Sequence, residues 1–287
     1  MRPLLRSMCV LAVVAALAAL LGASSGTAAR PATCSGDLSN IPSSLGTLSG
    51  TYSGNVTISG ACAVDAGPAV VNGDVTLLQG ATLVAAFSGS GLTVNGSILV
   101  QKGASLLVGC NPDSFPCFDD ASATTTISVS GNLLATQPLG VVVHNTTVNG
   151  NAIVHGGGGG VTCAPSGAFA AFGSPVYTDF EDNTLNGDLN VGGLETCWLG
   201  SLRNIVGGSI VDTNNTMADP DAGEVLQNTV QGNVVCIGNS PAVQFGDSGA
   251  APNLVAGNAV GQCGFDVLSP DPFYDGGGSQ PISIKTG

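Results

Sequence analysis

A short motif recurs nine times along the chain and limits its possible folds more than any other feature. Each copy has a central glycine, an apolar residue two positions before it, a small polar residue directly after it and an apolar residue two positions after it. The central glycines are Gly54, Gly73, Gly96, Gly131, Gly150, Gly187, Gly208, Gly232 and Gly257. Alternation of apolar and polar residues is typical of strands that bury one face. A glycine between two such strands is expected to allow a sharp bend without a Cβ penalty.

The spacing of the motifs matches one coil of a parallel β-helix. Successive glycines are 19, 23, 35, 19, 37, 21, 24 and 25 residues apart. One coil cannot bury its inner face alone, so stacked coils share a continuous core. We predict an all-β, parallel β-helix (solenoid) of about nine or more rungs over residues 52–265, since nine motifs are present. Insertions are expected near 103–124 and 156–183.

An antiparallel sandwich or barrel is the alternative fold, because it also has short strands at regular spacing. It gives no reason for one residue pattern to recur at the same point of every unit. Stacked coils do, because equivalent Asn side chains can form a ladder and equivalent Val side chains a column. The repeat therefore favours the β-helix.

Five consecutive glycines, Gly156 to Gly160, follow the fifth motif and raise the alternative of a phosphate-binding loop. Neither a Gly-Lys-Ser/Thr end nor a helical pattern follows them, so a phosphate loop is rejected. We predict instead that these glycines let the chain leave the coil, where the second insertion begins.

Residues 1–29 are expected to be a secretory signal peptide. Two arginines precede a run of apolar and small residues, Cys9 to Ala23, and small residues surround the expected cleavage site near Ala29. The apolar run is too short for a comfortable membrane span. We therefore expect a secreted, extracellular or cell-surface protein without a membrane span after signal removal. Residues 30–51 are expected to form an N-terminal cap or arm, and residues 266–287 a flexible tail.

Eight cysteines remain after the signal peptide, an even number that is typical of disulfides in an exported chain. Zinc is the alternative, but there is no Cys-x-x-Cys and only two histidines are present. A solenoid brings together only neighbouring coils, and pairing in sequence order gives separations of 28, 7, 34 and 27 residues. The predicted disulfides are Cys34–Cys62, Cys110–Cys117, Cys163–Cys197 and Cys236–Cys263. The first and last are expected to clamp the ends of the solenoid.

Acidic residues greatly outnumber basic ones. Without residues 1–29 the chain has 4 basic and 19 acidic residues, a formal charge of 4 − 19 = −15. A protein that binds nucleic acids or acidic polysaccharides needs clustered Lys and Arg, whose charges replace the counterions that binding releases. Nucleic-acid binding is therefore not expected.

Few side chains are candidates for catalysis. Parallel β-helices include polysaccharide lyases, in which a basic residue acts beside acids, and the solenoid offers only Lys102 and Arg203. Arg203 is the better candidate because Asp212, Asp219 and Asp221 follow it in the sequence. A surface ion pair is the simpler interpretation of Arg203.

A glycosidase needs two facing carboxylates. The candidates for such a pair are two sets of adjacent acids, Asp119–Asp120 and Glu181–Asp182. Neighbours on a strand point to opposite faces, and both pairs fall in the insertions, so we expect solvated loop acids. The two histidines, His144 and His155, are 11 residues apart with no cysteine or acid close in sequence. No metal site, cofactor or catalytic residue is therefore predicted.

Five of the 13 aromatic residues lie between Cys163 and Trp198. These candidate glycan-binding residues are Phe169, Phe172, Tyr177, Phe180 and Trp198. Aromatic faces stack on sugar rings, so the second insertion could form a glycan-binding lip. The alternative is that it folds onto the flank of the solenoid and buries its rings.

The segment "NTVQGNVVCIGNSPAV…NLVAGNAVGQC", within residues 228–263, resembles secreted bacterial repeat proteins with NTVxGN-type units and a Cys-containing closing unit. The resemblance is looser over residues 52–227. It implies a right-handed parallel β-helix at or outside the cell surface and implies no activity. The rhythm is also similar to bactofilin-type filament repeats, which lack an export signal and this cysteine pattern.

Two hypotheses about function follow. The first is a non-catalytic extracellular or cell-surface β-helix with a structural, surface-coat or adhesive role. The second is a carbohydrate-active protein that binds or cleaves a polysaccharide along one face of the solenoid. The expected partners are a cell-surface glycan or further copies of the same chain.

Overall fold

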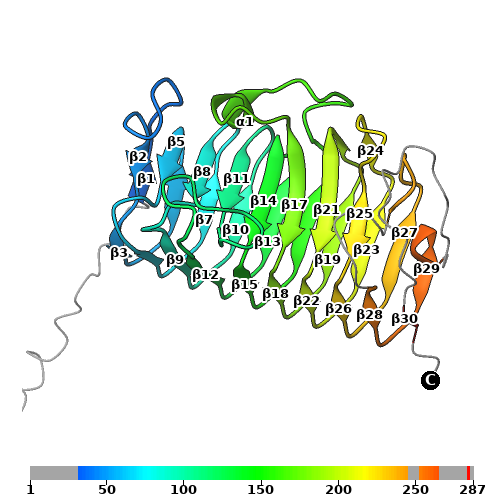
Figure 1. Ribbon diagram of the computed structural model, residues 1–287. Coiled ribbons are helices and arrows are strands. Elements are labelled where there is room, and N and C mark those ends of the chain that lie inside the picture. Colours follow the sequence, from blue (N-terminus) through cyan, green and yellow to red (C-terminus); the bar gives the residue numbers. More distant parts are fainter. Residues whose placement is uncertain (1–31, 245–251, 265–282, 285–287) are drawn as a thin grey trace, which may run out of the picture. The chain divides into compact units, whose positions relative to one another are not determined.

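The computed structural model describes residues 32–244, 252–264 and 283–284. The chain divides into two units, Met1–Arg30 and Pro31–Gly287, and all described residues belong to the second. The expected signal peptide therefore lies outside the described residues. The second unit is a parallel β-solenoid in which strands of successive turns stack side by side in sequence order (Figure 1).

Three parallel sheets, here named A, B and C, form the sides of the solenoid. Sheet A contains β1 (Ala32–Cys34), β4 (Val56–Ile58), β7 (Val75–Leu77), β10 (Ile98–Val100), β13 (Leu133–Thr136), β16 (Ala152–His155), β19 (Leu189–Gly192), β23 (Ile210–Thr213), β27 (Val234–Ile237) and β29 (Ala259–Gly261). Sheet B contains β2 (Gly46–Thr47), β5 (Ala61–Ala63), β8 (Thr82–Ala85), β11 (Ser105–Val108), β14 (Gly140–His144), β17 (Tyr177–Glu181), β21 (Trp198–Leu202) and β25 (Glu224–Leu226). Sheet C contains β3 (Gly50–Tyr52), β6 (Ala69–Val71), β9 (Gly91–Val94), β12 (Thr126–Val129), β15 (Thr146–Val148), β18 (Thr184–Leu185), β22 (Ile205–Val206), β26 (Thr229–Val230), β28 (Leu254–Val255) and β30 (Ser283–Ile284). The parallel β-helix predicted from the repeat is confirmed.

The nine motifs stack in the register that the repeat predicts. The apolar residues two positions before each glycine form one column on sheet C, from Tyr52 to Val255. The apolar residues two positions after each glycine form one column on sheet A, from Val56 to Ala259. Apart from the ends of the columns, these side chains are buried in the interior of the solenoid.

The small polar residue after each glycine forms a ladder along the corner between sheets C and A. The backbone N–H of Asn151 donates to Asn132 Oδ1 at 2.8 Å, and Asn151 Oδ1 accepts from the N–H of Asp188 at 2.8 Å. The same bond joins every pair of neighbouring motifs. A Cβ on Gly150 would lie 2.4 Å from Asn132 Oδ1. In the eight motifs after the first, glycine is therefore required by the close approach of the ladder, since none of the nine glycines has a positive φ.

Both predicted insertions leave the solenoid on the side of sheet B. The first follows β11 and contains the Cys110–Cys117 disulfide. The second begins at Gly156 to Gly160, whose φ angles all lie between 64° and 99°, and contains α1 (Gly167–Ala171). It ends earlier than expected, because β17 begins at Tyr177 and rejoins sheet B. A small sheet of β20 (Glu195–Thr196) and β24 (Thr216–Met217) and a 3-10 helix, η1 (Gln262–Gly264), complete the described elements.

The ends of the solenoid carry the expected clamps. The four disulfides join Cys34–Cys62, Cys110–Cys117, Cys163–Cys197 and Cys236–Cys263, which confirms the pairing in sequence order. The segment expected to be a cap or arm, residues 30–51, supplies β1 and β2 and most of β3, so it forms the first turn. Within the expected tail, Ser283–Ile284 pair with β28 as strand β30, and the other residues from 266 on lie outside the described part.

Candidate functional site

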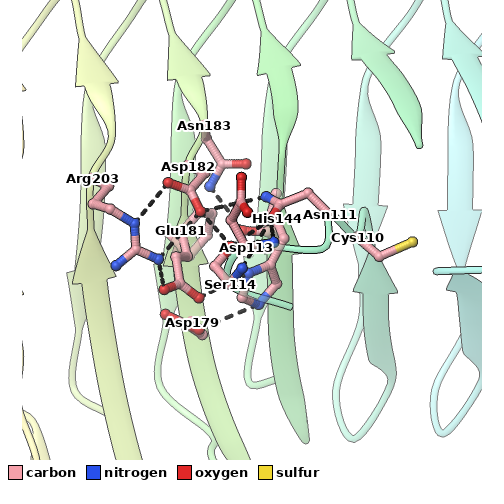
Figure 2. Close-up of polar contacts among 12 residues, drawn as sticks. Cys110, Asn111, Asp113, Ser114, His144, Asp179, Glu181, Asp182, Asn183 and Arg203 are labelled. Atoms are coloured by element: carbon pink, nitrogen blue, oxygen red, sulfur yellow. Dashed lines mark hydrogen bonds and ion pairs between the residues drawn. The ribbon is translucent and has the colours of Figure 1, made fainter. Parts of the chain in front are cut away.

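A cluster of charged side chains lies on the outer face of sheet B, beneath the loop closed by the Cys110–Cys117 disulfide (Figure 2). We define the His144 cluster as His144, Asp179, Glu181, Asp182 and Arg203. His144 is the last residue of β14, Asp179 and Glu181 lie on β17, and Arg203 follows β21. The parallel register places Glu181 directly beside His144 and Asp179 beside Val142.

His144 lies between two carboxylates. Its Nε2 is 3.3 Å from Asp179 Oδ2, and its Nδ1 is 3.1 Å from Glu181 Oε2. The side chain is almost completely buried, and the ring of Phe115 stacks on it with centroids 4.3 Å apart. Neither ring nitrogen makes a hydrogen bond, and Asp179 Oδ1 also has no partner. An imidazole N–H lies in the ring plane, so the two carboxylate oxygens sit close to the nitrogens without the alignment of a hydrogen bond.

Arg203 joins the cluster to the loop. Its Nε donates to Asp182 Oδ1 at 2.8 Å, and its Nη2 contacts Glu181 Oε1 and, at 3.2 Å, Asp182 Oδ2. Asp182 Oδ2 also accepts from Ser114 Oγ and, at 3.5 Å, from Asn111 Nδ2. Asp182 therefore connects the first insertion to the next turns of the solenoid.

An unusual backbone conformation lets adjacent acids meet one guanidinium. Asp182 has φ 58° and Arg203 has φ 53°, so both lie in the left-handed region that non-glycine residues rarely adopt. Strand alternation ends at Asp182, which allows Glu181 and Asp182 to reach Arg203 together. The expectation that Glu181 and Asp182 are solvated loop acids is wrong for this reason.

The carboxyl pKa values of Asp179 and Asp182 are shifted in opposite directions. Complete burial raises the pKa of Asp179, although His144 opposes the rise. Partial burial also opposes ionisation of Asp182, but hydrogen bonds from Arg203 and Ser114 hold its pKa below the ordinary value. At neutral pH the cluster thus contains an ion pair that is firmly charged and a buried carboxyl that is reluctant to ionise.

The other acids weighed from the sequence lie elsewhere. Asp212, expected near Arg203, points into the solenoid interior, where it is 2% exposed. Arg203 is engaged in ion pairs, as the simpler interpretation proposed, although with different partners. Asp119 accepts bonds from the N–H of Ser88 at 2.6 Å and its hydroxyl at 2.7 Å. Asp120 Oδ1 accepts hydrogen bonds from the backbone N–H and the hydroxyl of Ser122, two residues further along the same loop.

The five candidate aromatic residues do not share one surface. Phe180 is buried in the solenoid interior, and Phe169 is buried between α1 and the outer face of sheet B. Phe172 stacks on Phe118 with centroids 4.5 Å apart. Tyr177 and Trp198 are half-buried neighbours, with ring centroids 6.2 Å apart.

These features define a class: a disulfide-clamped parallel β-solenoid with a buried histidine–carboxylate–arginine cluster. Comparison with protein families, curated proteins and solved structures gave no match. Over the residues that the structure describes, none of the helices has the length and apolar character of a membrane span.

Proposed function

We propose that the protein is a non-catalytic extracellular β-helix with a structural, surface-coat or adhesive role, and that sheet A is its contact face. The observation that carries the proposal is the outward side of this sheet. One outward residue on each strand forms a column of ten: Thr33, Thr57, Thr76, Leu99, Leu134, Ile153, Asn190, Val211, Val235 and Val260. Six of the ten are aliphatic and none carries a charge, whereas the outward column of sheet C, from Thr51 to Leu254, is mostly threonine and serine.

The chemistry of this face suits contact with an extended surface. Neighbouring strands lie about 4.8 Å apart, so the column presents side chains at regular intervals. Leu99, Leu134 and Ile153 lie on successive turns, and Leu99 and Leu134 line a shallow depression. Nearer the C-terminal end, Ile237 is 49% and Val260 43% exposed. Partly exposed aliphatic side chains on successive turns, with exposed ones further along the same sheet, give this face the apolar character that interaction sites typically have.

Two further observations support this proposal, the first against catalysis along the solenoid and the second for a location outside the cell. Arg203 and the acids nearest to it are occupied by one another under the loop, so they do not line an open groove. Four disulfides are typical of a chain that matures in an oxidising compartment.

The test is binding of the purified chain to isolated cell envelopes. Leu134→Lys places a charge in the middle of the sheet A face, and Thr147→Lys, on the outward side of sheet C, is the matched control. We expect Leu134→Lys to weaken binding at least about tenfold, because burying an unpaired charge costs more than 1.4 kcal/mol. Equal binding by the two variants would reject sheet A as the contact face.

The second candidate, glycan binding on sheet B, rests on Trp198. Its indole lies over Gly200, where an added Cβ would meet Trp198 Cη2 at 2.2 Å, and it remains half-buried. A flat indole on a glycine is a suitable platform for a sugar ring. Polysaccharide pull-down that is lost in Trp198→Ala but kept in Leu134→Lys would favour this candidate.

A further inference from the structure

We propose that His144, Asp179 and Glu181 form a binding site for one divalent transition-metal ion, of which Zn²⁺ is the best fit. One nitrogen of His144 and one oxygen of each carboxylate all lie within 4.8 Å of one another. Imidazole nitrogen and carboxylate oxygen are ligands that zinc accepts at about 2.0–2.2 Å, so two ligands of one ion lie at most about 4.4 Å apart and the three atoms must draw together when an ion binds. This site is separate from the contact face on sheet A.

The unsatisfied atoms of the cluster point to a missing partner. Both nitrogens of His144 and Asp179 Oδ1 are buried without a hydrogen bond. A buried polar group without a partner is destabilising, and such groups are rare in folded proteins. Because Asp179 Oδ2 faces Nε2 and Glu181 Oε2 faces Nδ1, an ion at either nitrogen would satisfy that nitrogen and the carboxylate beside it, and the other carboxylate would turn toward the ion.

The charges of the cluster also favour a divalent cation. Asp179, Glu181 and Asp182 supply three negative charges when ionised, and Arg203 supplies one positive charge. With a neutral imidazole the sum is 1 − 3 = −2, which one divalent ion would bring to zero. Because a buried uncompensated charge is strongly destabilising, a cluster of this composition needs either two protons or one such ion.

The surroundings hold the three ligands as the outer shell of a metal site does. Glu181 binds Arg203 through Oε1, which leaves Oε2 directed at His144. Phe115 stacks on the imidazole and fixes the plane of the ring. Such partners orient ligands and commonly change metal affinity by about 10–100-fold.

The chain contains a matched control for the test. His155 is the other histidine; it is exposed at the end of β16 and belongs to no candidate metal cluster among the described residues. The full chain, with its disulfides intact, is stripped with a chelator, incubated with Zn²⁺, desalted and analysed for metal content. We expect about one zinc per chain in the wild type and in His155→Gln, and less than about a tenth of that in His144→Gln, since a site of three protein ligands loses most of its affinity with one of them.

Cobalt provides an independent measurement on the same proteins. Co²⁺ held by nitrogen and oxygen ligands absorbs in the visible range, and this band should appear in the wild type and His155→Gln alone. Glu181→Gln, checked by circular dichroism for an intact fold, serves as a second variant should His144→Gln fail to fold. A wild type that retains no zinc, or equal retention by His144→Gln and the wild type, would overturn the proposal.

Discussion

At the scale of single residues, the motif glycine and the polar residue that follows it act as one unit. The ladder oxygen of one turn occupies the space where a Cβ of the next glycine would lie. The same oxygen accepts a backbone N–H of the next turn, so it satisfies a donor that the corner would otherwise expose. Steric and hydrogen-bonding requirements therefore select the two residues together.

Gly150→Ala should destabilise the solenoid, and Gly54→Ala should not. The added Cβ of Gly150→Ala would lie 2.4 Å from Asn132 Oδ1 and 2.7 Å from the carbonyl oxygen of Gly131, whereas nothing lies within 4 Å of the equivalent position at Gly54. Overpacking of this kind costs about 1–3 kcal/mol. Urea unfolding of both variants measures the difference, and equal stability would disprove the steric role of the ladder.

A second, buried ladder lies at the corner between sheets B and C. Asn183, Asn204, Asn228 and Asn253 stack there, and each side-chain oxygen accepts from the backbone N–H of the preceding turn. Asn204 Nδ2 also donates to the carbonyl of Phe180 at 2.7 Å. Because these asparagines are at most 1% exposed, water cannot replace a lost bond.

Asn204→Ala should therefore cost more than Asn186→Ala. The first change leaves the buried N–H of Asn183 without its acceptor, at about 1–3 kcal/mol, and also removes one donor to the carbonyl of Phe180. Asn186 is exposed, and its side chain donates only to Asn149 Oδ1, at 2.9 Å. The change Asn186→Ala should therefore alter the free energy of unfolding by less than about 0.5 kcal/mol. Thermal unfolding of the two variants tests this order, and equal losses would contradict the buried ladder.

Asp212 makes stability depend on pH. Burial raises the pKa of this carboxyl to about 7. In the unfolded chain this carboxyl ionises near its ordinary pKa of 3.8. A rise in pH from 4 to 7 therefore stabilises the unfolded state relative to the folded state. The free energy of unfolding should fall by up to about 4 kcal/mol across this window and then level off, at 1.36 kcal/mol for each pH unit between the two pKa values.

Asp212→Asn removes this carboxyl and keeps an oxygen for Asn215, which donates to Asp212 Oδ1 in the wild type. The variant should be more stable than the wild type at pH 8. Its free energy of unfolding should fall less steeply than that of the wild type between pH 4 and 7. Some decline should remain, because burial also raises the pKa of Asp179. Chemical unfolding at several pH values measures both slopes, and parallel curves would show that Asp212 does not carry the dependence.

At the scale of elements, the repeat held more information about the candidate site than residue types did. His144 precedes Gly150 by six residues, and Glu181 precedes Gly187 by six. The interval of 37 residues between these glycines is the interval between His144 and Glu181, so the motif alignment already places the two side chains on neighbouring strands. A search for acids close in sequence misses this pair, because stacking makes neighbours of residues one turn apart.

Other contacts in the site do not follow from the repeat. The backbone of Asp182 adopts the left-handed region although Asp does not require it, so the pairing of Glu181 and Asp182 with one arginine was unpredictable from alternation. The path of the Cys110–Cys117 loop over His144 depends on the Phe115 stack and the Asp182 bonds. Neither contact follows from periodicity, whereas the apolar columns do.

The loop closed by Cys110–Cys117 should protect His144 from solvent reagents. His144 is fully buried beneath Phe115, whereas His155 is exposed. Diethyl pyrocarbonate should modify His155 quickly and His144 slowly in the folded chain. In the double variant Cys110→Ser/Cys117→Ser the rate at His144 should rise and that at His155 should stay the same. Mass spectrometry of peptides measures both rates, and an unchanged rate at His144 would show that the loop is held without its disulfide.

At the scale of the whole solenoid, contacts join only neighbouring turns, so stability is distributed along the axis. The strands of sheet A pair strictly in the order in which the turns follow one another, from β1 to β29. In such an array the terminal turns have a neighbour on one side only and open first. Cys34–Cys62 joins the first turn to the second, and Cys236–Cys263 lies at the opposite end. The disulfides thus stand where the array is weakest.

Removing one clamp should therefore loosen one end only. In Cys34→Ser/Cys62→Ser we expect faster amide hydrogen exchange in β1 and β4, because a disulfide typically contributes about 2–4 kcal/mol and no neighbouring turn on the outer side compensates for its loss. Exchange in β13, β16 and β19 should stay unchanged, since intact turns separate these strands from the opened end. Cys236→Ser/Cys263→Ser is the matched control and should affect β27 and β29 instead. An equal rise along the whole solenoid in either variant would show that the chain unfolds as a single cooperative unit and that end clamping is not what these two disulfides do.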